Sequence, residues 1–205
     1  MIVIFDYGVG NLTSIMKMIG KSGNQAIISS RREDVESADK LILPGMGHFD
    51  NCMRKFNASG LRELITRRVL EDNLPTLGIC VGLQMFFSTS EEGCEQGLGW
   101  LKGTVVRFNE KAFPSRLTIP NMGWLDVSPA KESSMLRGLE QSRFYFAHSF
   151  HIQSEEPETD LLYADYGYTF TAAVQKENLI GVQFHPEKSH RFGMQLLKNF
   201  AERPL

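Results

Sequence analysis

The stretch Thr76-Leu77-Gly78-Ile79-Cys80-Val81-Gly82-Leu83-Gln84 begins as an apolar strand and ends as a segment typical of a buried helix. Its order of strand, tight turn and helix, with Gly-x-Cys-x-Gly at the centre, is typical of a nucleophile elbow in which Cys replaces Ser. Gly78 and Gly82 fit this turn because a Cβ atom has no room where the strand and helix backbones pass. The turn would present the Cys80 thiol at a helix N-terminus, which favours the thiolate, and would direct the Val81 N–H towards an oxyanion. An ordinary buried Cys in a βα unit is the alternative interpretation of this local pattern.

Size and charge restrict the class of protein. The chain has 205 residues, enough for one substantial core, so we expect a single domain spanning residues 1–205. Its hydrophobic content of 42%, charged content of 22% and formal net charge of -2 predict a soluble globular protein without the basic surface that nucleic-acid binding requires. No apolar run has the length needed to span a bilayer, so we expect no membrane partner.

The N-terminus and the cysteines indicate a cytoplasmic protein. Residues 1–6 lack a basic segment and a small-residue cleavage site, so they predict a first strand and not a signal peptide. Cys52, Cys80 and Cys94 are odd in number and form no C-x-x-C pair. This count and spacing argue against a disulfide framework and against a zinc site.

Strand and helix patterns alternate in the first half of the chain. Apolar runs at residues 2–5, 26–29 and 40–43 predict strands, while residues 12–19 and a long amphipathic segment from about residue 50 to residue 72 predict helices. The alternation predicts an α/β fold with a mostly parallel, doubly wound sheet and helices on both faces. The carboxyl ends of the strands would bring the turns Gly8–Gly10 and Pro44–Gly47 to the same edge as Cys80. The Gly8 turn does not continue as a dinucleotide-binding motif, because Thr13 occupies the third glycine position.

The second half predicts an antiparallel extension of this sheet. Strand-like runs rich in β-branched and aromatic residues occupy positions 100–108, 144–152, 161–164, 170–175 and 180–184. A polar, Gly-rich segment at residues 88–99 predicts a loop, and a last helix is expected from about His190 to Ala201.

A Cys nucleophile needs a base, and the base needs a group that orients it. His185 is the candidate among five histidines, because it closes the apolar run 181–184 and would lie at the same sheet edge as Cys80. Glu187 follows the rigid Pro186 and is placed to accept the second imidazole N–H. His-x-Glu alone is more often a surface turn, but an upstream Gly-x-Cys-x-Gly elbow strengthens the catalytic interpretation.

Three blocks of the chain resemble the signatures of class I (triad) glutamine amidotransferases. They are Pro44-Gly45-x-Gly47, Gly78-Ile79-Cys80-x-Gly82-x-Gln84 and Gly181-Val182-Gln183-Phe184-His185-Pro186-Glu187. Further blocks, spread over essentially the whole chain, are similar to the glutaminase subunit of imidazole glycerol phosphate synthase: Asp6-Tyr7-Gly8-x-Gly10-Asn11-Leu12, Ser90-Glu91-Glu92, Gly97-Leu98-Gly99-Trp100, Met122-Gly123-Trp124 and His148-Ser149. The resemblance implies the flavodoxin-like α/β fold of this family.

The resemblance also implies a role for each matching residue. Cys80 would attack the carboxamide carbon of L-glutamine, His185 would carry the proton to the leaving ammonia, and Glu187 would orient the imidazole. The other implied sites are an oxyanion hole of Val81, Gly45, Met46 and Gly47, a glutamine site of Gln84, Glu92, His148, Ser149 and Phe150, and a partner interface of Asn11, Asn121, Met122 and Trp124. No metal and no other cofactor is implied.

The implied partner is a (β/α)8-barrel cyclase. In the family this barrel forms a heterodimer with the glutaminase, receives ammonia through an internal channel, and makes imidazole glycerol phosphate and AICAR in histidine biosynthesis. Asn11 and a turn at Met122-Gly123-Trp124 would face it. The chain departs from the family at Asn121 and Phe150, where His and Tyr are common, and the first of these departures leaves the partner's identity open.

Two other functions remain as alternatives. Residues 142–146 and 189–194 are more similar to paralogous glutaminases whose cyclase-like partner amidates a surface-polysaccharide sugar. The other alternative is a non-catalytic regulatory or binding protein that keeps this fold, against which the retained Cys80, His185 and Glu187 argue.

Overall fold

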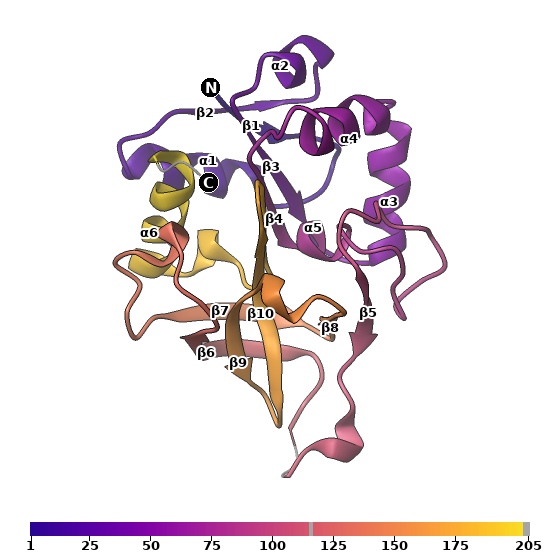
Figure 1. Ribbon diagram of the computed structural model, residues 1–205, viewed down its shortest axis with the longest axis vertical. Helices are drawn as coiled ribbons and strands as arrows, with labels where there is room; N and C mark the ends of the chain where they lie inside the picture. Colours follow the sequence, from indigo (N-terminus) through magenta and orange to yellow (C-terminus); the bar gives the residue numbers. More distant parts are fainter. Residues whose placement is uncertain (115–116, 203–205) are drawn as a thin grey trace.

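A mixed β-sheet runs through the centre of the computed structural model, which describes residues 1–114 and 117–202 (Figure 1). The strand order is β2-β1-β3-β4-β11-β10-β9-β6-β7, and the first five strands are parallel to one another. These five are β1 (Ile2–Phe5), β2 (Ala26–Ser29), β3 (Lys40–Gly45), β4 (Thr76–Cys80) and β11 (Leu179–Val182). Every residue of β1, β4 and β11 is buried, as continuous apolar runs in a doubly covered sheet should be.

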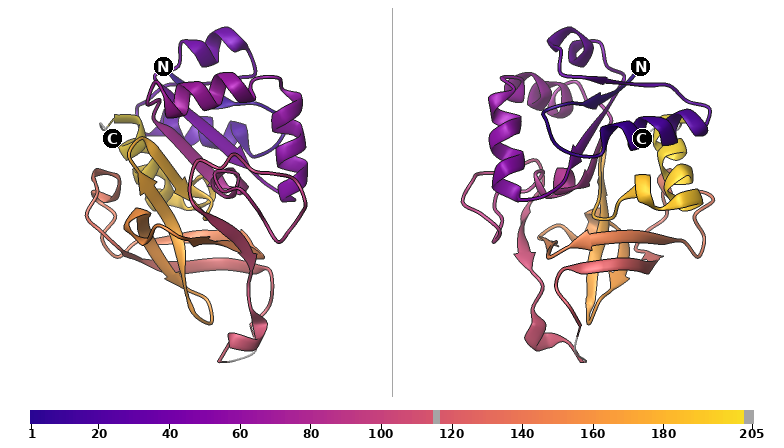
Figure 2. Two further views of the ribbon diagram at one scale, coloured as in Figure 1. Left: turned by 45° about the vertical axis from the view of Figure 1, so that its right-hand side comes forward. Right: turned by 180° about the vertical axis from the view of Figure 1, so that it is seen from behind.

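Helices cover both faces of the parallel strands (Figure 1, Figure 2). α1 (Leu12–Lys21) and α6 (His190–Glu202) pack together on one face, while α3 (Phe49–Ala58) and α4 (Arg62–Leu70) lie on the other. The short α2 (Arg32–Glu36) contacts β1 and α4. The predicted α/β class with helices on both faces is therefore confirmed. Among the described residues, none of the helices combines the length and the apolar character needed to cross a membrane.

The expected antiparallel extension continues the sheet beyond β11. Its strands are β10 (Thr169–Lys176), β9 (Asp160–Asp165), β6 (Asn121–Pro129) and β7 (Arg143–His148), and β8 (Phe150–Ser154) pairs with β10 and with β5 (Gly103–Arg107). One-turn helices are α5 (Val81–Gln84), η1 (Glu110–Ala112), η2 (Ser134–Leu136), η3 (Pro157–Thr159) and η4 (Pro186–Lys188). In Figure 1 this extension lies below the parallel strands and is continuous with them.

The single long helix expected at about residues 50–72 is wrong, because the segment forms two helices. α3 ends at Ala58 and α4 begins at Arg62. Between them Gly60 has φ +70°, a left-handed conformation that commonly ends a helix. The apolar spacing continues across the break, and periodicity therefore predicted one element.

Three other expectations need correction. The helix after the elbow is only the four-residue α5, so its macrodipole is that of one turn and not of a long helix. Met122 to Trp124 do not form a turn, because they pair with β7 as part of β6. The strand expected at residues 144–152 is divided at Ser149 into β7 and β8, which pair with different strands.

Candidate active site

The elbow holds Cys80 in a strained backbone conformation at the end of β4. Its φ of 55° and ψ of -112° lie in a region that side-chain-bearing residues rarely adopt, and such strain persists only where neighbours enforce it. A Cβ on Gly78 would lie 2.7 Å from the Phe86 ring, and one on Gly82 would lie 1.9 Å from the Leu43 carbonyl oxygen. The steric reason predicted for both glycines is confirmed.

The Pro44–Gly47 segment lies directly beside this elbow, and its first two residues end β3 instead of belonging to a turn as expected. β3 and β4 are parallel, with Gly45 opposite Cys80, and a Cβ on Gly45 would lie 2.3 Å from the Gly82 nitrogen. Gly47 has φ +89°, a backbone conformation that glycine adopts readily because it has no Cβ atom. The four predicted oxyanion residues thus surround the nucleophile, and their function as donors stays a prediction.

His185 reaches the same edge from β11, the strand next to β4. Its Nδ1 lies 3.0 Å from Glu187 Oε1, and the two side chains are only 3% and 2% exposed. Burial by itself lowers the pKa of His185, but the facing Cys80 and the hydrogen bond to Glu187 outweigh burial and raise the pKa from 6.5 to about 10. The site therefore favours the imidazolium that a Cys–His mechanism requires.

The antiparallel extension fixes the position of His185. The His185 N–H donates to the Tyr145 carbonyl at 2.9 Å, which ties the base to β7. The Ser189 hydroxyl donates to the His185 carbonyl at 2.6 Å and accepts from the Tyr145 N–H at 3.0 Å. The parallel strands thus carry the nucleophile, and a pairing with the antiparallel half holds the base against it.

A pocket of about 260 Å³ opens onto Cys80 and His185. All five predicted glutamine-binding residues line it: Gln84, Glu92, His148, Ser149 and Phe150. Glu92 also accepts a hydrogen bond from the Phe49 N–H at 2.8 Å, so the N-terminus of α3 holds this carboxylate at the pocket wall. These placements bring the predicted residues together, while their contacts with a substrate stay predictions.

Sequence reasoning assigned no role to three other residues of this region. Pro120 and Lys188 line the pocket, and Gln183 donates to Cys80 Sγ at 3.7 Å. Lys188 and Gln183 flank His185 closely in the sequence, which was the available signal. Pro120 comes from the segment before β6 and had no local pattern that would have revealed it.

The predicted interface residues differ in exposure. Met122 is 65% exposed, and Asn11 and Trp124 are half-buried. Asn121 is 1% exposed, so the expectation that its side chain contacts a partner directly needs correction. Its amide instead lies 3.1 Å from His148 Nε2, inside the protein.

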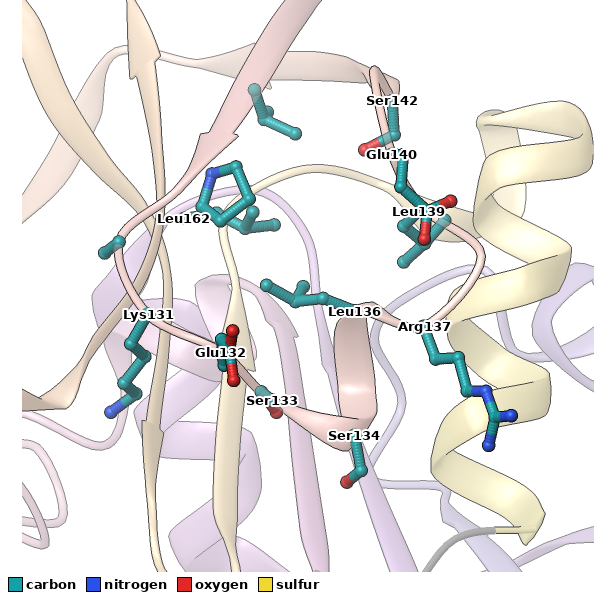
Figure 3. Close-up of a pocket in the computed structure, with 13 residues that line it drawn as sticks. Lys131, Glu132, Ser133, Ser134, Leu136, Arg137, Leu139, Glu140, Ser142 and Leu162 are labelled. Atoms are coloured by element: carbon teal, nitrogen blue, oxygen red, sulfur yellow. The ribbon is translucent and has the colours of Figure 1, made fainter.

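A second cavity, of about 900 Å³, lies away from these residues. It is lined by the end of β6, η2 and the segment that leads to β7 (Figure 3). Leu136 points into its middle, while the charged ends of Lys131 and Arg137 point away from it (Figure 3). Because none of its lining residues belongs to the Cys80 group, the smaller pocket is the candidate active site.

Within residues 1–114 and 117–202, no group of three or more His, Cys, Asp or Glu side chains is arranged to hold a metal ion. What the Cys80 pocket offers is a thiol, a base oriented by a carboxylate, and backbone N–H groups beside them, which together suit acyl transfer from an amide.

Comparisons with known proteins agree with this chemistry. The model of the family described as "Glutamine amidotransferase class-I" matches residues 3–203. The imidazole glycerol phosphate synthase subunit HisH 2 of Pseudomonas aeruginosa is 49% identical over 203 residues, covering 98% of this chain and 99% of the relative. Subunit HisH of Leptospira interrogans is 43% identical over 202 residues, covering 98% and 99%. Among solved structures, PurLQS from Thermotoga maritima has a similar fold, with a TM-score of 0.72 at 18% identity, covering 97% of this chain and 96% of that one.

Proposed function

Because the chain belongs to the class I glutamine amidotransferases, we propose that it hydrolyses L-glutamine at Cys80 and passes the ammonia to a partner subunit. The observation that carries this proposal is the buried His185–Glu187 pair, 3.0 Å apart, of which His185 lines the same pocket as a Cys on a strained elbow. Residues 1–205 would act as one glutaminase domain.

The proposed reaction has two halves. Cys80 Sγ attacks the carboxamide carbon, its proton passes to His185 Nε2, and the same proton leaves with ammonia as the γ-glutamyl thioester forms. Water then attacks the thioester with His185 as base, and glutamate is released. Glu187 accepts from Nδ1 throughout and stabilises the imidazolium.

The oxyanion of each tetrahedral intermediate needs preorganised donors. The Val81 N–H directly follows the nucleophile, and a backbone N–H of the Met46–Gly47 segment would approach from the neighbouring strand. Removing one such donor typically costs two to three orders of magnitude in rate. A donor supplied only after the partner docks would therefore keep the isolated subunit slow.

The proposed partner is a (β/α)8-barrel cyclase that forms a cytoplasmic heterodimer with this chain and makes imidazole glycerol phosphate and AICAR in histidine biosynthesis. The relatives support this choice, since they are subunits of imidazole glycerol phosphate synthase. Met122, which is 65% exposed, would lie in the interface, and ammonia would pass to the barrel through an internal channel.

A second acceptor is favoured by one specific arrangement. The segments 142–146 and 189–194, which resemble the sugar-amidating paralogues, meet at Trp124. His190 stacks on the Trp124 ring with centroids 5.4 Å apart, and the Arg143 guanidinium lies 5.8 Å from the ring centroid. These residues surround Trp124, an expected interface residue. The second candidate function would therefore differ from the first in the partner subunit and in the molecule that accepts the ammonia.

Covalent labelling tests the glutaminase proposal without a partner. The glutamine analogue 6-diazo-5-oxo-L-norleucine should modify Cys80, as identified by peptide mass spectrometry, and glutamine should protect against it. Cys52→Ala is the matched control and should still be labelled, whereas Cys80→Ala should not. Absence of the Cys80 adduct, with no glutamate release in a complex with either type of barrel, would refute the proposal. Ammonia transfer in those complexes, to the imidazole precursor or to a nucleotide sugar, then separates the two acceptors.

A further inference from the structure

Four polar side chains near Cys80 are almost fully buried and have no part in the reaction steps above. Gln183 is 0% exposed, Asn121 1%, Gln84 2% and His148 6%. They come from four places in the chain: the segment after β11, the start of β6, the end of α5 and the end of β7. Because buried polar groups are nearly always paired, their partners indicate what they do.

The two glutamines form a connection to the nucleophile. Gln183 Nε2 donates to Cys80 Sγ at 3.7 Å, and Gln183 Oε1 accepts from Gln84 Nε2 at 3.0 Å. Because its oxygen is occupied by Gln84, the Gln183 amide keeps its N–H2 directed at the sulfur. A hydrogen bond to the charged form of a group stabilises that form, so this contact favours the thiolate.

The other two residues hold the far end of this connection. Gln84 Nε2 also donates to the Phe150 carbonyl at 3.2 Å, and His148 Nδ1 donates to the same oxygen at 2.8 Å. Burial lowers the pKa of His148 to about 3, so the ring is neutral and its Nε2 is an acceptor. Asn121 Nδ2 donates to that Nε2 at 3.1 Å. The Phe150 carbonyl oxygen therefore connects the pair Gln84 and Gln183 to the pair His148 and Asn121.

We propose that these residues form one positioning network, in which Gln183 holds the sulfur of Cys80 and Asn121 and His148 act through the Phe150 carbonyl and Gln84 to fix the Gln183 amide. This inference rests on the proposed function only for its effect on turnover. Asn121 is also the neighbour of the exposed Met122, so the network ends next to the expected partner surface.

The sulfur has other titratable neighbours, and the test must separate the network from them. His185 faces it from β11, Cys52 from α3 and Tyr7 from the segment after β1. Glu92 and Lys188 line the same pocket. None of these is altered in the variants below, so a change in thiol reactivity reports on the network.

The experiment measures alkylation of the Cys80 peptide by iodoacetamide against pH in the full chain, using mass spectrometry to exclude signal from the other cysteines. In Gln183→Leu and Gln183→Met, neither of which adds a charge, the midpoint should move to higher pH by about one unit or more, as expected for loss of a hydrogen bond to a charged group. The rate of glutamate release in the partner complex should fall about tenfold or more, because a tenfold change in rate corresponds to the same free energy as a shift of one pH unit. Gln153→Met, at an exposed position of β8, is the control and should change neither quantity.

A double-mutant cycle tests whether Asn121, at the end of the network farthest from Cys80, is connected to Gln183. Asn121→Leu should move the midpoint in the same direction as Gln183→Met but less, and the double variant should show less than the sum. Asn199→Leu removes another buried amide, one that donates to the Met135 carbonyl at 2.9 Å, and should leave the midpoint unchanged. Should Gln183→Met fail to fold, Gln183→Leu decides the first step.

Two results would overturn the network. An unchanged midpoint in folded Gln183 variants would show that Gln183 does not hold the sulfur, and strictly additive shifts would show that Asn121 is not connected to it. The alkylation midpoint does not depend on turnover. A wild-type chain that releases no glutamate in any complex would therefore refute the proposed function and still leave the network to be decided by alkylation.

Discussion

Glu187 is the residue through which the chemistry of His185 is best tested. Its side chain is 2% exposed, and its Oε1 is the only partner of His185 Nδ1 among the interactions found in the described residues. In the proposed mechanism the carboxylate fixes the imidazole tautomer and stabilises its cation, so a neutral amide in its place fails in both respects.

Glu187→Gln should lower kcat by about two to four orders of magnitude, in the range found when the orienting carboxylate of a triad is replaced. The stability effect has a defined sign. The folded-state pKa of His185 is raised from 6.5 to about 10, so its stabilisation is complete below pH 6.5 and is lost as pH rises towards 10. The deficit of Glu187→Gln in free energy of unfolding, measured in urea, should thus be largest near pH 6 and shrink towards pH 10. A deficit independent of pH would contradict this assignment.

His148 should make the protein sensitive to acid. Its folded-state pKa is lowered by burial from 6.5 to about 3, so the unfolded chain binds a proton in this range and the folded chain does not. Stability should fall as pH drops from 6.5 towards 3, by up to about 1.4 kcal/mol per pH unit. Burial also lowers the pKa of His151, which adds in the same direction. His148→Gln should have a shallower slope in urea titrations at several pH values.

At the scale of elements, the helix break at Gly60 can be tested with a matched pair of glycines. Gly60 has φ +70° with open space around its Cα, whereas Gly20 lies within α1, also with open space. Gly60→Ala should destabilise the fold by about 1 kcal/mol, because a side chain disfavours the left-handed conformation. Gly20→Ala should stabilise it by about 0.5–1 kcal/mol through helix propensity. Equal effects in urea unfolding would show that the Gly60 conformation does not matter.

The elements that the sequence predicted well are those whose signal is local. The apolar runs of β1 and β2 and the apolar spacing of the last helix are local patterns, and the elbow follows from the steric demand on Gly78 and Gly82. β6 was missed because only one of its nine residues is buried, and because its pairing with β7 and β9 depends on other parts of the chain. The role of Gln183 was missed for a similar reason, since its partners Cys80 and Gln84 lie about a hundred positions away.

At the scale of the whole molecule, the site lies where the two halves of the sheet meet. β4 carries the nucleophile, and β11 links it to the antiparallel half, where β7 holds the backbone of His185. The same half carries Met122, on the strand that begins with the buried Asn121. A partner that contacts this strand would therefore touch an element that is connected through β7 to His185, the proposed catalytic base.

Surface substitutions can locate the partner face without disturbing the active site. Met122 is 65% exposed and Leu70 is 50% exposed, so both are large apolar groups in contact with water. Leu70 ends α4, close to the start of β4, at the edge of the sheet opposite to Cys80.

Burying a carboxylate in an apolar contact is unfavourable, so Met122→Glu should weaken binding to the proposed barrel cyclase about tenfold or more, as for a central interface residue. Leu70→Glu should bind normally, and both should keep wild-type labelling of Cys80 by the glutamine analogue. Titration calorimetry showing equal affinities for Met122→Glu and wild type would place the partner on another face, because no interface built around β6 tolerates a buried, unpaired carboxylate at its most exposed apolar residue.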